Sequence, residues 1–202
     1  KSGTDGFLSF PADGVLYPDR GTVEFWLSPV DWDGNDRQFH TFFETRGHEG
    51  VVQIFKDSNA NLVFEIGRGK TPLHESAFFS LKGIDQREWW DTPTEADVVP
   101  INVWGPGRWH HIACVWSPSR QYLYIDGKCV SGKLLMEIPA SLGTTFHLGD
   151  LSKNLSRSTL SLIDRVYIYD RPLTEKQIQA HFAGDYRKKF KFSEEHFRLD
   201  YK

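Results

Sequence analysis

The residues that point most directly to chemistry are tryptophans with charged neighbours. Trp89 and Trp90 are adjacent, and Arg87 and Asp91 flank the pair. Sugar rings stack their apolar faces on aromatic side chains, and their hydroxyls exchange hydrogen bonds with charged groups. Neighbours in an extended segment point to opposite sides, so at least one ring is expected to be an exposed sugar platform with Arg87 and Asp91 as polar contacts. The alternative is that both rings pack beneath their own segment.

Two more tryptophans lie in sequence that is typical of loops. Trp32 stands in an Asp- and Asn-rich turn at residues 31–36, and Trp104 precedes a Gly-Pro pair. We expect both to be further candidates for sugar stacking, with packing in the core as the alternative for each. The remaining tryptophans lie in predicted strands and are expected in the core: Trp26, Trp109 and Trp116.

The segments that must position these side chains are mostly strands. Apolar and polar residues alternate in short runs bounded by turn residues, which is the pattern of half-buried strands. The clearest runs are residues 22–27, 38–45, 51–56, 62–66, 109–116, 121–125, 128–131, 144–148 and 160–169. One helix is predicted near the C-terminus, where Thr174 and Gln177 form a capping box and Gly184 follows the last turn.

Composition and charge exclude several classes of protein. Of the 202 residues, 39% are hydrophobic and 25% are charged, which excludes a disordered or fibrous chain. The 24 Lys and Arg against 27 Asp and Glu give a net charge of −3, which argues against a nucleic-acid or membrane-surface binder. No apolar run reaches the roughly 18 residues needed to span a bilayer. We therefore expect no nucleic-acid partner and no membrane insertion.

One domain with a long insertion is the expected organisation. Residues 1–186 hold all the predicted elements, and residues 187–202 are a polar tail or the start of a linker. Residues 67–107 break the rhythm of strands and far exceed the usual connection of about 4–6 residues. Three of the candidate tryptophans lie in this insertion, and its apolar content favours an ordered segment.

The two cysteines do not suggest a disulfide. Cys114 and Cys129 fall on predicted strands that are separated by a third strand. Strands two apart in a sheet lie about 9–10 Å from each other, which is too far for a bridge. We expect two free, buried thiols.

Three segments, in order along the chain, resemble the laminin-G-like, concanavalin A-like jelly rolls, a family that includes bacterial carbohydrate-binding modules. Residues 21–27 (GTVEFWL) are similar to the opening strand of that family. Residues 107–113 (GRWHHIA) and 123–127 (LYIDG) are similar to its central hairpin, and residues 163–174 (IDRVYIYDRPLT) to its closing strand and the helix after it. The resemblance implies an all-β, two-sheet antiparallel jelly-roll sandwich with one short C-terminal helix. It leaves function open, because this fold hosts lectins, adhesion modules and enzymes.

The resemblance also indicates which residues an enzyme of this fold would need. Related glucanases carry a Glu-x-Asp-x-(x)-Glu strand, whose alternation puts the nucleophile and the acid on one face, and residues 95–100 (EADVVP) lack the closing Glu that supplies the second of these carboxylates. Related alginate lyases carry a Gln-x-His strand, and residues 53–55 (QIF) have Phe in place of His. No serine-nucleophile elbow or zinc-binding helix motif occurs, so we expect no catalysis. An unfamiliar catalytic site would have to draw on the carboxylates of the insertion: Glu75, Glu88, Glu95 and Asp97.

Jelly rolls of this family often carry a structural calcium ion, which takes carboxylate and carbonyl oxygens as ligands. Asp164, a charge within the apolar residues 162–166, is the best candidate ligand, and Asp5 near the N-terminal strand is the second. For Asp164, the alternative is a pair with an arginine or hydrogen bonds from the backbone. His110 and His111 face opposite sides of one strand, so they cannot bind one metal together and are expected to be structural.

These observations favour a non-catalytic carbohydrate-binding module that takes a polysaccharide or oligosaccharide. We expect it to be appended to a secreted polysaccharide-processing protein, with a catalytic domain of that parent as a second partner. The expected location is therefore secreted, periplasmic or at the cell surface. The alternatives are a laminin-G-type protein-adhesion module, a structural domain that supports a neighbouring catalytic domain, and, last, a glycoside hydrolase or lyase with an unfamiliar site.

Overall fold

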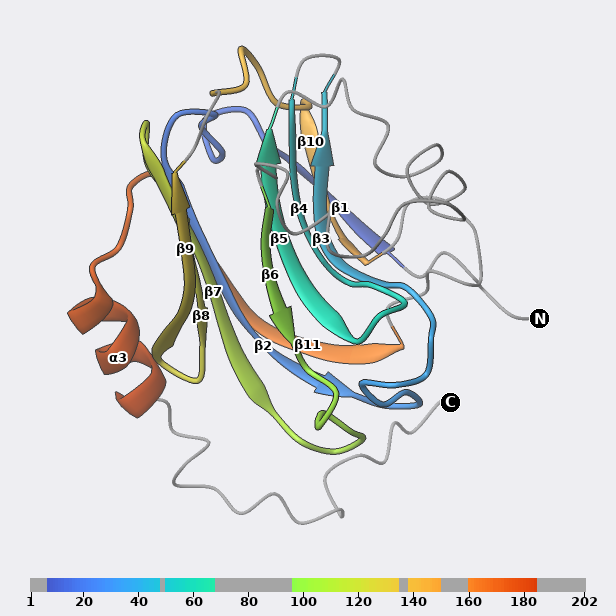
Figure 1. The fold of residues 1–202 in the computed structure, drawn as a ribbon. Coiled ribbons are helices and arrows are strands. Elements are labelled where there is room, and N and C mark those ends of the chain that lie inside the picture. Colours follow the sequence, from blue (N-terminus) through green and yellow to red (C-terminus); the bar gives the residue numbers. More distant parts are fainter. Residues whose placement is uncertain (1–6, 48–49, 68–95, 135–137, 150–159, 185–202) are drawn as a thin grey trace, which may run out of the picture.

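The computed structural model describes residues 7–47, 50–67, 96–134, 138–149 and 160–184. Across these ranges, eleven strands form two antiparallel sheets that pack face to face, and one helix follows the last strand (Figure 1). This architecture confirms the predicted all-β sandwich with a short C-terminal helix. Within the same ranges, no helix has the length and apolar character needed to cross a membrane.

The first sheet has six strands in the order β1-β10-β3-β4-β5-β6. These strands are β1 (Phe7–Pro11), β10 (Thr145–Gly149), β3 (His40–Arg46), β4 (Val51–Lys56), β5 (Asn61–Gly67) and β6 (Ala96–Pro100). Strand β6 falls inside the predicted insertion and pairs with β5. Residues 68–95 and 187–202 lie outside the described residues, so the domain boundaries and the rest of the insertion stay predictions.

The second sheet has five strands in the order β11-β2-β7-β8-β9. These strands are β11 (Ser161–Tyr169), β2 (Gly21–Pro29), β7 (His110–Trp116), β8 (Arg120–Ile125) and β9 (Lys128–Leu134). Strand β2 pairs with β11 on one side and β7 on the other, antiparallel to both. The segments that resemble the opening and the closing strand of the family, in β2 and β11, are therefore neighbours in the sheet.

The core lies between the two sheets and is filled by alternate residues of their strands. Val23, Phe25 and Leu27 of β2 are no more than 1% exposed and face the apolar side chains of the six-stranded sheet. Phe43, Ile54 and Phe64 are fully buried counterparts from β3, β4 and β5. Burying each such side chain contributes about 1.5–3 kcal/mol. The period of two that predicted these strands is thus the period that fills the core.

Strand β7 is apolar on both faces because each face is covered. Cys114 and Trp116 join the core between the sheets, whereas Ala113 and Val115 pack in a second cluster with Ile178 of the helix. Helix α3 (Glu175–Gly184) lies along the outer face of the five-stranded sheet (Figure 1). Both faces of β7 are therefore covered, one by the opposite sheet and the other by the helix.

The helix begins with the predicted capping box. The backbone N–H of Gln177 donates to Oγ1 of Thr174 at 3.4 Å, and the backbone N–H of Thr174 donates to Oε1 of Gln177 at 2.9 Å. These bonds satisfy donors that a helix N-terminus otherwise leaves unpaired. Upstream, Oγ1 of Thr22 donates to the Arg171 carbonyl and accepts from the Leu173 N–H, which ties the connection before the helix to β2.

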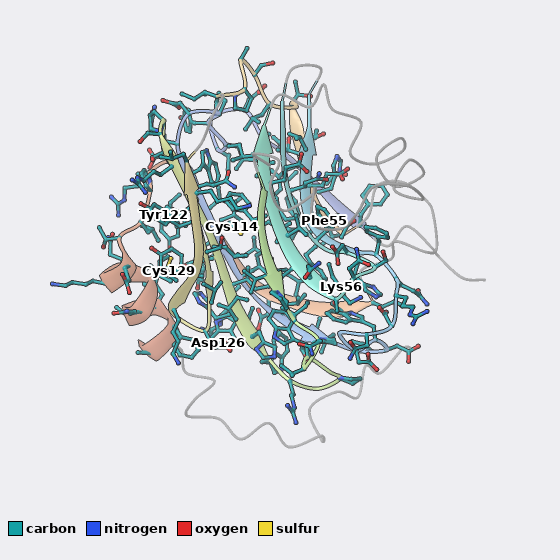
Figure 2. All side chains as sticks on the ribbon, in the orientation of Figure 1. Phe55, Lys56, Cys114, Tyr122, Asp126 and Cys129 are labelled. Carbon is teal, nitrogen blue, oxygen red and sulfur yellow. The ribbon has the colours of Figure 1, made fainter. Side chains whose placement is uncertain are left out.

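The cysteines are both free, but only one is buried. Cys114 lies between the sheets, whereas Cys129 on β9 is exposed, and β8 separates their strands (Figure 2). The expectation of two buried thiols is therefore wrong for Cys129. The reason is that β9 is an edge strand, most of whose residues are exposed.

A buried lysine anchors the loop between β2 and β3. Nζ of Lys56 contacts Oδ1 of Asp36 at 2.5 Å and donates to the carbonyls of Gln38 at 3.0 Å and Asp57 at 3.2 Å. Oδ2 of Asp36 lies 2.6 Å from Nε2 of His40. Burial by itself raises the pKa of Asp36, but the hydrogen bonds from Lys56, the Gln38 backbone and His40 outweigh it and leave the pKa below its usual value.

A tight backbone contact fixes the start of β2. Gly21 is paired with Trp116 across the ladder, and a Cβ at Gly21 would overlap the Trp116 indole ring. That ring is fully buried, and its Nε1–H donates to the Tyr17 carbonyl at 3.0 Å. The position therefore requires a residue without a side chain.

We predict that Gly21→Ala lowers the free energy of unfolding by about 1–3 kcal/mol, as overpacked cores do, because Trp116 must shift. Gly105→Ala is the matched control, since nothing lies within 4 Å of a Cβ placed there. The control should change stability by less than about 0.5 kcal/mol. Urea unfolding of both variants measures the difference. If Gly21→Ala and Gly105→Ala lowered the free energy of unfolding equally, the close contact between Gly21 and Trp116 would not be what limits the residue at position 21.

We predict that Lys56→Met lowers the free energy of unfolding by about 3–5 kcal/mol, because it leaves Asp36 and two carbonyls without their partner. The lowered pKa of Asp36 stabilises the fold above the ordinary Asp pKa of about 3.9, and that contribution is lost as the pH falls through the folded-state pKa. Lys56→Met should therefore lose less stability than the wild type below about pH 4. Lys176→Met, on the exposed face of α3, is the control and should leave the acid dependence unchanged. Unchanged acid dependence in both variants would show that the Lys56 contact is not what lowers the Asp36 pKa.

Candidate functional site

The candidate site lies on the outer face of the five-stranded sheet, opposite the core. Because side chains alternate along β2, Glu24 and Trp26 point away from the core that Phe25 and its alternating neighbours fill. His111 of β7 is in register with Trp26, and the two rings lie 5.3 Å apart. Two neighbouring strands thus place a carboxylate, an indole and an imidazole on one surface.

Strand β11 contributes to the same surface through a β-bulge. Asp164 is in register with Trp26 and Tyr167 with Glu24, so three steps along β11 match two steps along β2. The extra residue lies at Arg165, whose φ is +53°. Val166 packs against the core, whereas Arg165, Tyr167 and Tyr169 all line the outer surface. The bulge is therefore what adds an arginine to the row of tyrosines.

The last turns of α3 form the opposite wall. Ala180, His181 and Gly184 face the site, and the ring of Phe182 stacks on Trp26 at 5.8 Å. The tip of the β8–β9 hairpin comes close to this helix, because a Cβ at Gly127 would lie 2.9 Å from Cδ1 of Phe182. Asp126 and Gly127 both have positive φ, as a two-residue hairpin turn requires.

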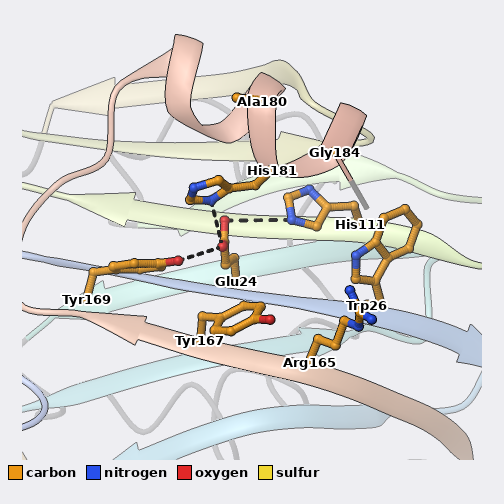
Figure 3. A pocket seen from close by; sticks show the side chains of 9 residues that line it. All are labelled: Glu24, Trp26, His111, Arg165, Tyr167, Tyr169, Ala180, His181 and Gly184. Carbon is orange, nitrogen blue, oxygen red and sulfur yellow. Dashed lines mark hydrogen bonds and ion pairs between the residues drawn. The ribbon is translucent and has the colours of Figure 1, made fainter. Parts of the chain in front are cut away.

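Together these elements form a pocket of about 420 Å³ between the sheet and the helix, and the pocket is open to solvent (Figure 3). Its floor comes from β2, β7 and β11 and its roof from α3. Aromatic and charged side chains alternate around it, which is typical of small-molecule sites with a few convergent polar groups. The lining residues are Glu24, Trp26, His111, Arg165, Tyr167, Tyr169, Ala180, His181 and Gly184.

Glu24 is the central polar group of the pocket. Its side chain is only 2% exposed, and Oε1 accepts hydrogen bonds from the Tyr169 hydroxyl at 3.1 Å and from Nδ1 of His181 at 2.9 Å (Figure 3). Oε2 has no hydrogen-bond partner among the described residues, and Nε2 of His111 lies 3.7 Å away. Burial raises the pKa of Glu24, although the nearby His181 and the hydroxyl of Tyr169 partly offset this effect.

Tyr169 acts only as a hydrogen-bond donor to Glu24. Burial, with the charge of Glu24 beside it, raises the pKa of Tyr169 to about 12. Its hydroxyl therefore keeps its proton at neutral pH and can only donate to the carboxylate. One oxygen of Glu24 is thus committed to Tyr169 and His181, and the other lies 3.7 Å from Nε2 of His111 without a hydrogen bond in the described structure.

Metal-ligating side chains do not cluster in the described part of the chain. No group of three or more His, Cys, Asp or Glu side chains there is arranged to hold a metal ion. Asp164 is half-buried on β11 beside the pocket, and Asp5 lies outside the described residues. Calcium binding by Asp164 and Asp5 therefore stays a prediction.

The predicted platforms Trp32 and Trp104 are both buried. Trp32 is 3% exposed, stacks on His40 at 4.7 Å, and donates from Nε1 to Oγ of Ser161 at 2.9 Å. Trp104 is 5% exposed and stacks on His110 at 4.0 Å. The expectation that either presents an exposed ring is wrong, because the loops that carry them fold their indoles into the core.

The remaining predicted sugar contacts lie outside the described residues: Arg87, Trp89, Trp90 and Asp91. The pocket instead contains residues that sequence reasoning did not select. A signal for them was present, because Glu24 is a charge in a strand whose other face is wholly apolar. Likewise, the alternation that placed Ile168 inward implied that Tyr167 and Tyr169 face outward.

No curated protein matches this sequence. Solved structures with a similar fold include the receptor binding domain of botulinum neurotoxin mosaic serotype C/D, with tetraethylene glycol bound on its Hcn sub-domain. That match has a TM-score of 0.66 and 13% identity, and it covers 89% of this chain and 40% of that chain. The ligand binding domain of botulinum neurotoxin serotype D in complex with N-acetylneuraminic acid has a TM-score of 0.63 and 12% identity, covering 89% and 39%.

At such identities these matches show the fold alone, and the chain spans about two fifths of the length of those domains. The family assignment comes from the sequence itself. The laminin-G-type model of the concanavalin A-like lectin/glucanases superfamily matches residues 2–179, which include both sheets and the first half of α3. The chain therefore belongs to the concanavalin A-like lectin/glucanase superfamily.

Proposed function

We propose that this domain is a non-catalytic carbohydrate-binding module and that a saccharide binds in the pocket between α3 and the five-stranded sheet. The observation that carries the proposal is Glu24, a buried carboxylate in the lining of the pocket, whose Oε2 makes no hydrogen bond in the described structure and lies 3.7 Å from Nε2 of His111. Leaving such an acceptor unpaired costs about 1–3 kcal/mol, and more when it is charged. A ligand that presents a hydroxyl donor recovers this loss.

The walls of the pocket suit a sugar ring. Tyr167 is 49% exposed and faces the cavity, so its ring is available for stacking against a pyranose face. Trp26 closes the floor beside it, and His181, whose side chain is 38% exposed, offers a polar edge. The volume of about 420 Å³ falls in the usual range for small-ligand sites, about 300–1,000 Å³.

The same pocket is poorly equipped for glycoside hydrolysis. That reaction needs two carboxyl groups, one as acid and one as base or nucleophile. Among the lining residues, Glu24 is the sole carboxylate. The superfamily includes glucanases as well as lectins, and the composition of this pocket favours binding.

The comparisons support the proposal at the level of fold. One similar structure is described as a ligand binding domain in complex with N-acetylneuraminic acid, a sugar. The wider expectations stay part of the proposal: a second platform at Trp89 and Trp90 with Arg87 and Asp91, a structural calcium ion, and a secreted parent protein with a catalytic domain.

The proposal predicts saccharide binding that depends on Tyr167. A panel of neutral and acidic oligosaccharides, tested by calorimetry or affinity electrophoresis, should give at least one ligand. Tyr167→Ala should weaken its binding by about threefold to tenfold, as loss of an aromatic contact worth about 0.5–1.5 kcal/mol does. Phe10→Ala is the matched control, because Phe10 is 39% exposed on β1, the edge strand of the other sheet.

Two further variants, Trp89→Ala and Trp90→Ala, locate the site. Weakening by Tyr167→Ala alone assigns the saccharide to the pocket. Weakening by the tryptophan variants alone moves the site to the insertion and overturns the pocket assignment. If the domain binds no saccharide of the panel, the proposed carbohydrate-binding function is wrong. If it captures a protein partner without sugar, the alternative of a protein-adhesion module is favoured.

We predict that Glu24→Gln stabilises the fold at neutral pH while it weakens saccharide binding. The raised pKa of Glu24 stabilises the protein fully below the ordinary Glu pKa of about 4.3, and this contribution is lost as the pH rises through the folded-state pKa. The variant should lack that loss, as thermal melts between pH 4 and 8 would show.

Glu175→Gln is the control for that experiment, because Glu175 is an exposed acid in the first turn of α3. Its removal should slightly destabilise the protein at neutral pH, since an acid there favours the helix dipole by about 0.3–1 kcal/mol. Opposite signs for the two variants would support a carboxylate kept for binding. A destabilising Glu24→Gln would show that the charge serves the fold.

A further inference from the structure

We propose that the C-terminal end of α3 is a wall of the pocket that opens and closes, and that ionisation of Glu24 controls how often it opens. This wall, called the helix end below, consists of residues 180–184, which follow the buried Ile178. As a regulation of the pocket, the inference rests on the proposed function. The opening itself is a property of the free protein and is measured without a ligand.

The helix end is held to the sheet by few contacts. Ile178 is the one buried residue of α3, and it packs with Ala113 and Val115 of β7. Beyond this anchor, the contacts that the structure describes between the helix end and the sheet come from His181 and Phe182. Segments with few buried apolar contacts open at a lower free energy than the core does. The easiest motion of α3 is therefore an opening of its C-terminal turns while Ile178 stays in place.

Glu24 lies beneath the helix end and is bonded to it. Its side chain is 2% exposed, although it belongs to the outer face of the sheet (Figure 3). Oε1 accepts a hydrogen bond from Nδ1 of His181 at 2.9 Å, so a residue of the helix end contacts the buried carboxylate directly. Opening of the helix end breaks this bond and admits water to Glu24. An ionised carboxylate gains far more from that water than a protonated one does.

The charged and titratable groups around Glu24 come from three elements. They are His111 of β7, Arg165, Tyr167 and Tyr169 of β11, and His181 of α3. Only His181 belongs to the helix end, so the other four stay with the sheet when the helix end opens. The change in the surroundings of Glu24 is therefore the loss of His181 and the gain of water.

The sign of the pH dependence follows from the burial of Glu24. Burial raises its pKa, and the charge of His181 and the hydrogen bonds from Tyr169 and His181 offset this effect only in part. Opening removes the burial and brings the pKa back towards its ordinary value. The closed state thus holds the proton more tightly, and a rise in pH favours the open state. His181 acts in the same direction, because an imidazole loses its positive charge as the pH rises.

The opening changes access to the pocket. Ala180, His181 and Gly184 line it, so the pocket loses one wall when the helix end opens. We expect the pocket to be closed most firmly in acid. Ligands should enter and leave it faster as the pH rises, because the open state is then populated more often.

Hydrogen exchange of the amides of residues 180–184 tests the opening. The observed rates, divided by the intrinsic exchange rate at each pH, give the equilibrium constant for opening. In the wild type this constant should rise between about pH 4 and pH 8, by about tenfold for each unit that separates the Glu24 pKa in the closed and open states. The amide of Ile178, bonded to the Thr174 carbonyl at 3.0 Å, is the internal reference and should exchange more slowly.

Three variants identify the group that titrates. Glu24→Gln should keep the constant at its low acidic value across the whole range. Glu175→Gln is the matched control, an exposed acid at the other end of the same helix, and should leave the rise intact. His181→Asn offers an amide N–H close to the position of Nδ1 without titrating, so the rise should persist there as well.

The outcomes separate this inference from the proposed function. If the helix end and Ile178 exchange at the same rate, there is no local opening and the inference is wrong. It is also wrong if Glu24→Gln retains the rise, or if His181→Asn abolishes it. If the rise depends on Glu24 but no saccharide binds, the opening is supported and the proposed function is wrong. A bound saccharide whose dissociation rate ignores pH would show that ligands do not pass this wall.

Discussion

The structure depends on strand β2, which is buried along its whole length and must therefore be matched on two faces. Its inward residues meet the six-stranded sheet, and its outward residues meet α3 and the pocket. The same backbone that holds the core thus holds Glu24 and Trp26. In the proposed function, this central strand would hold the two side chains more rigidly than a loop could, which would lower the entropy lost when a ligand binds.

The pocket carries a local cost in stability. The outer face of a central strand could be sealed by apolar contacts, as Ala113, Val115 and Ile178 seal the neighbouring part of the sheet. At Glu24 the protein instead buries a carboxylate, supports one oxygen with Tyr169 and His181, and leaves the other without a hydrogen bond in the described structure, 3.7 Å from Nε2 of His111. Such local conflicts between burial and polarity are typical of functional sites.

Much of the fold could be predicted because its signals are local. The alternation in β2, the capping box at Thr174 and the Asp126-Gly127 turn each act within a few residues, and each forms as expected. Exposure was harder to predict, because it depends on contacts between distant segments. Trp32 lies in polar loop sequence, yet it is buried by His40 and Lys56 from two strands of the other sheet.

The candidate site was harder to predict than the exposure of single residues, because β2, β7, β11 and α3 all contribute to it. One signal was readable in the closing strand: the inward residues Ile163, Val166 and Ile168 are spaced by three and then by two. A regular strand keeps a spacing of two, so the longer step marks the bulge. What the sequence does not show is that α3 lies above this point and closes a pocket over it.

The bulge at Arg165 has a consequence for how such a domain evolves. The ladder is in register on both sides of the extra residue, so a chain that lacked it would keep every other side chain of β11 on its present face. Ile163 and Val166 would still face inward, and Asp164 and Tyr167 outward. Gain or loss of this single codon would therefore leave the sandwich intact while it adds a cationic side chain to the outer face or removes one. A one-residue insertion is thus a route by which relatives of the same fold can come to differ in the charge of this surface.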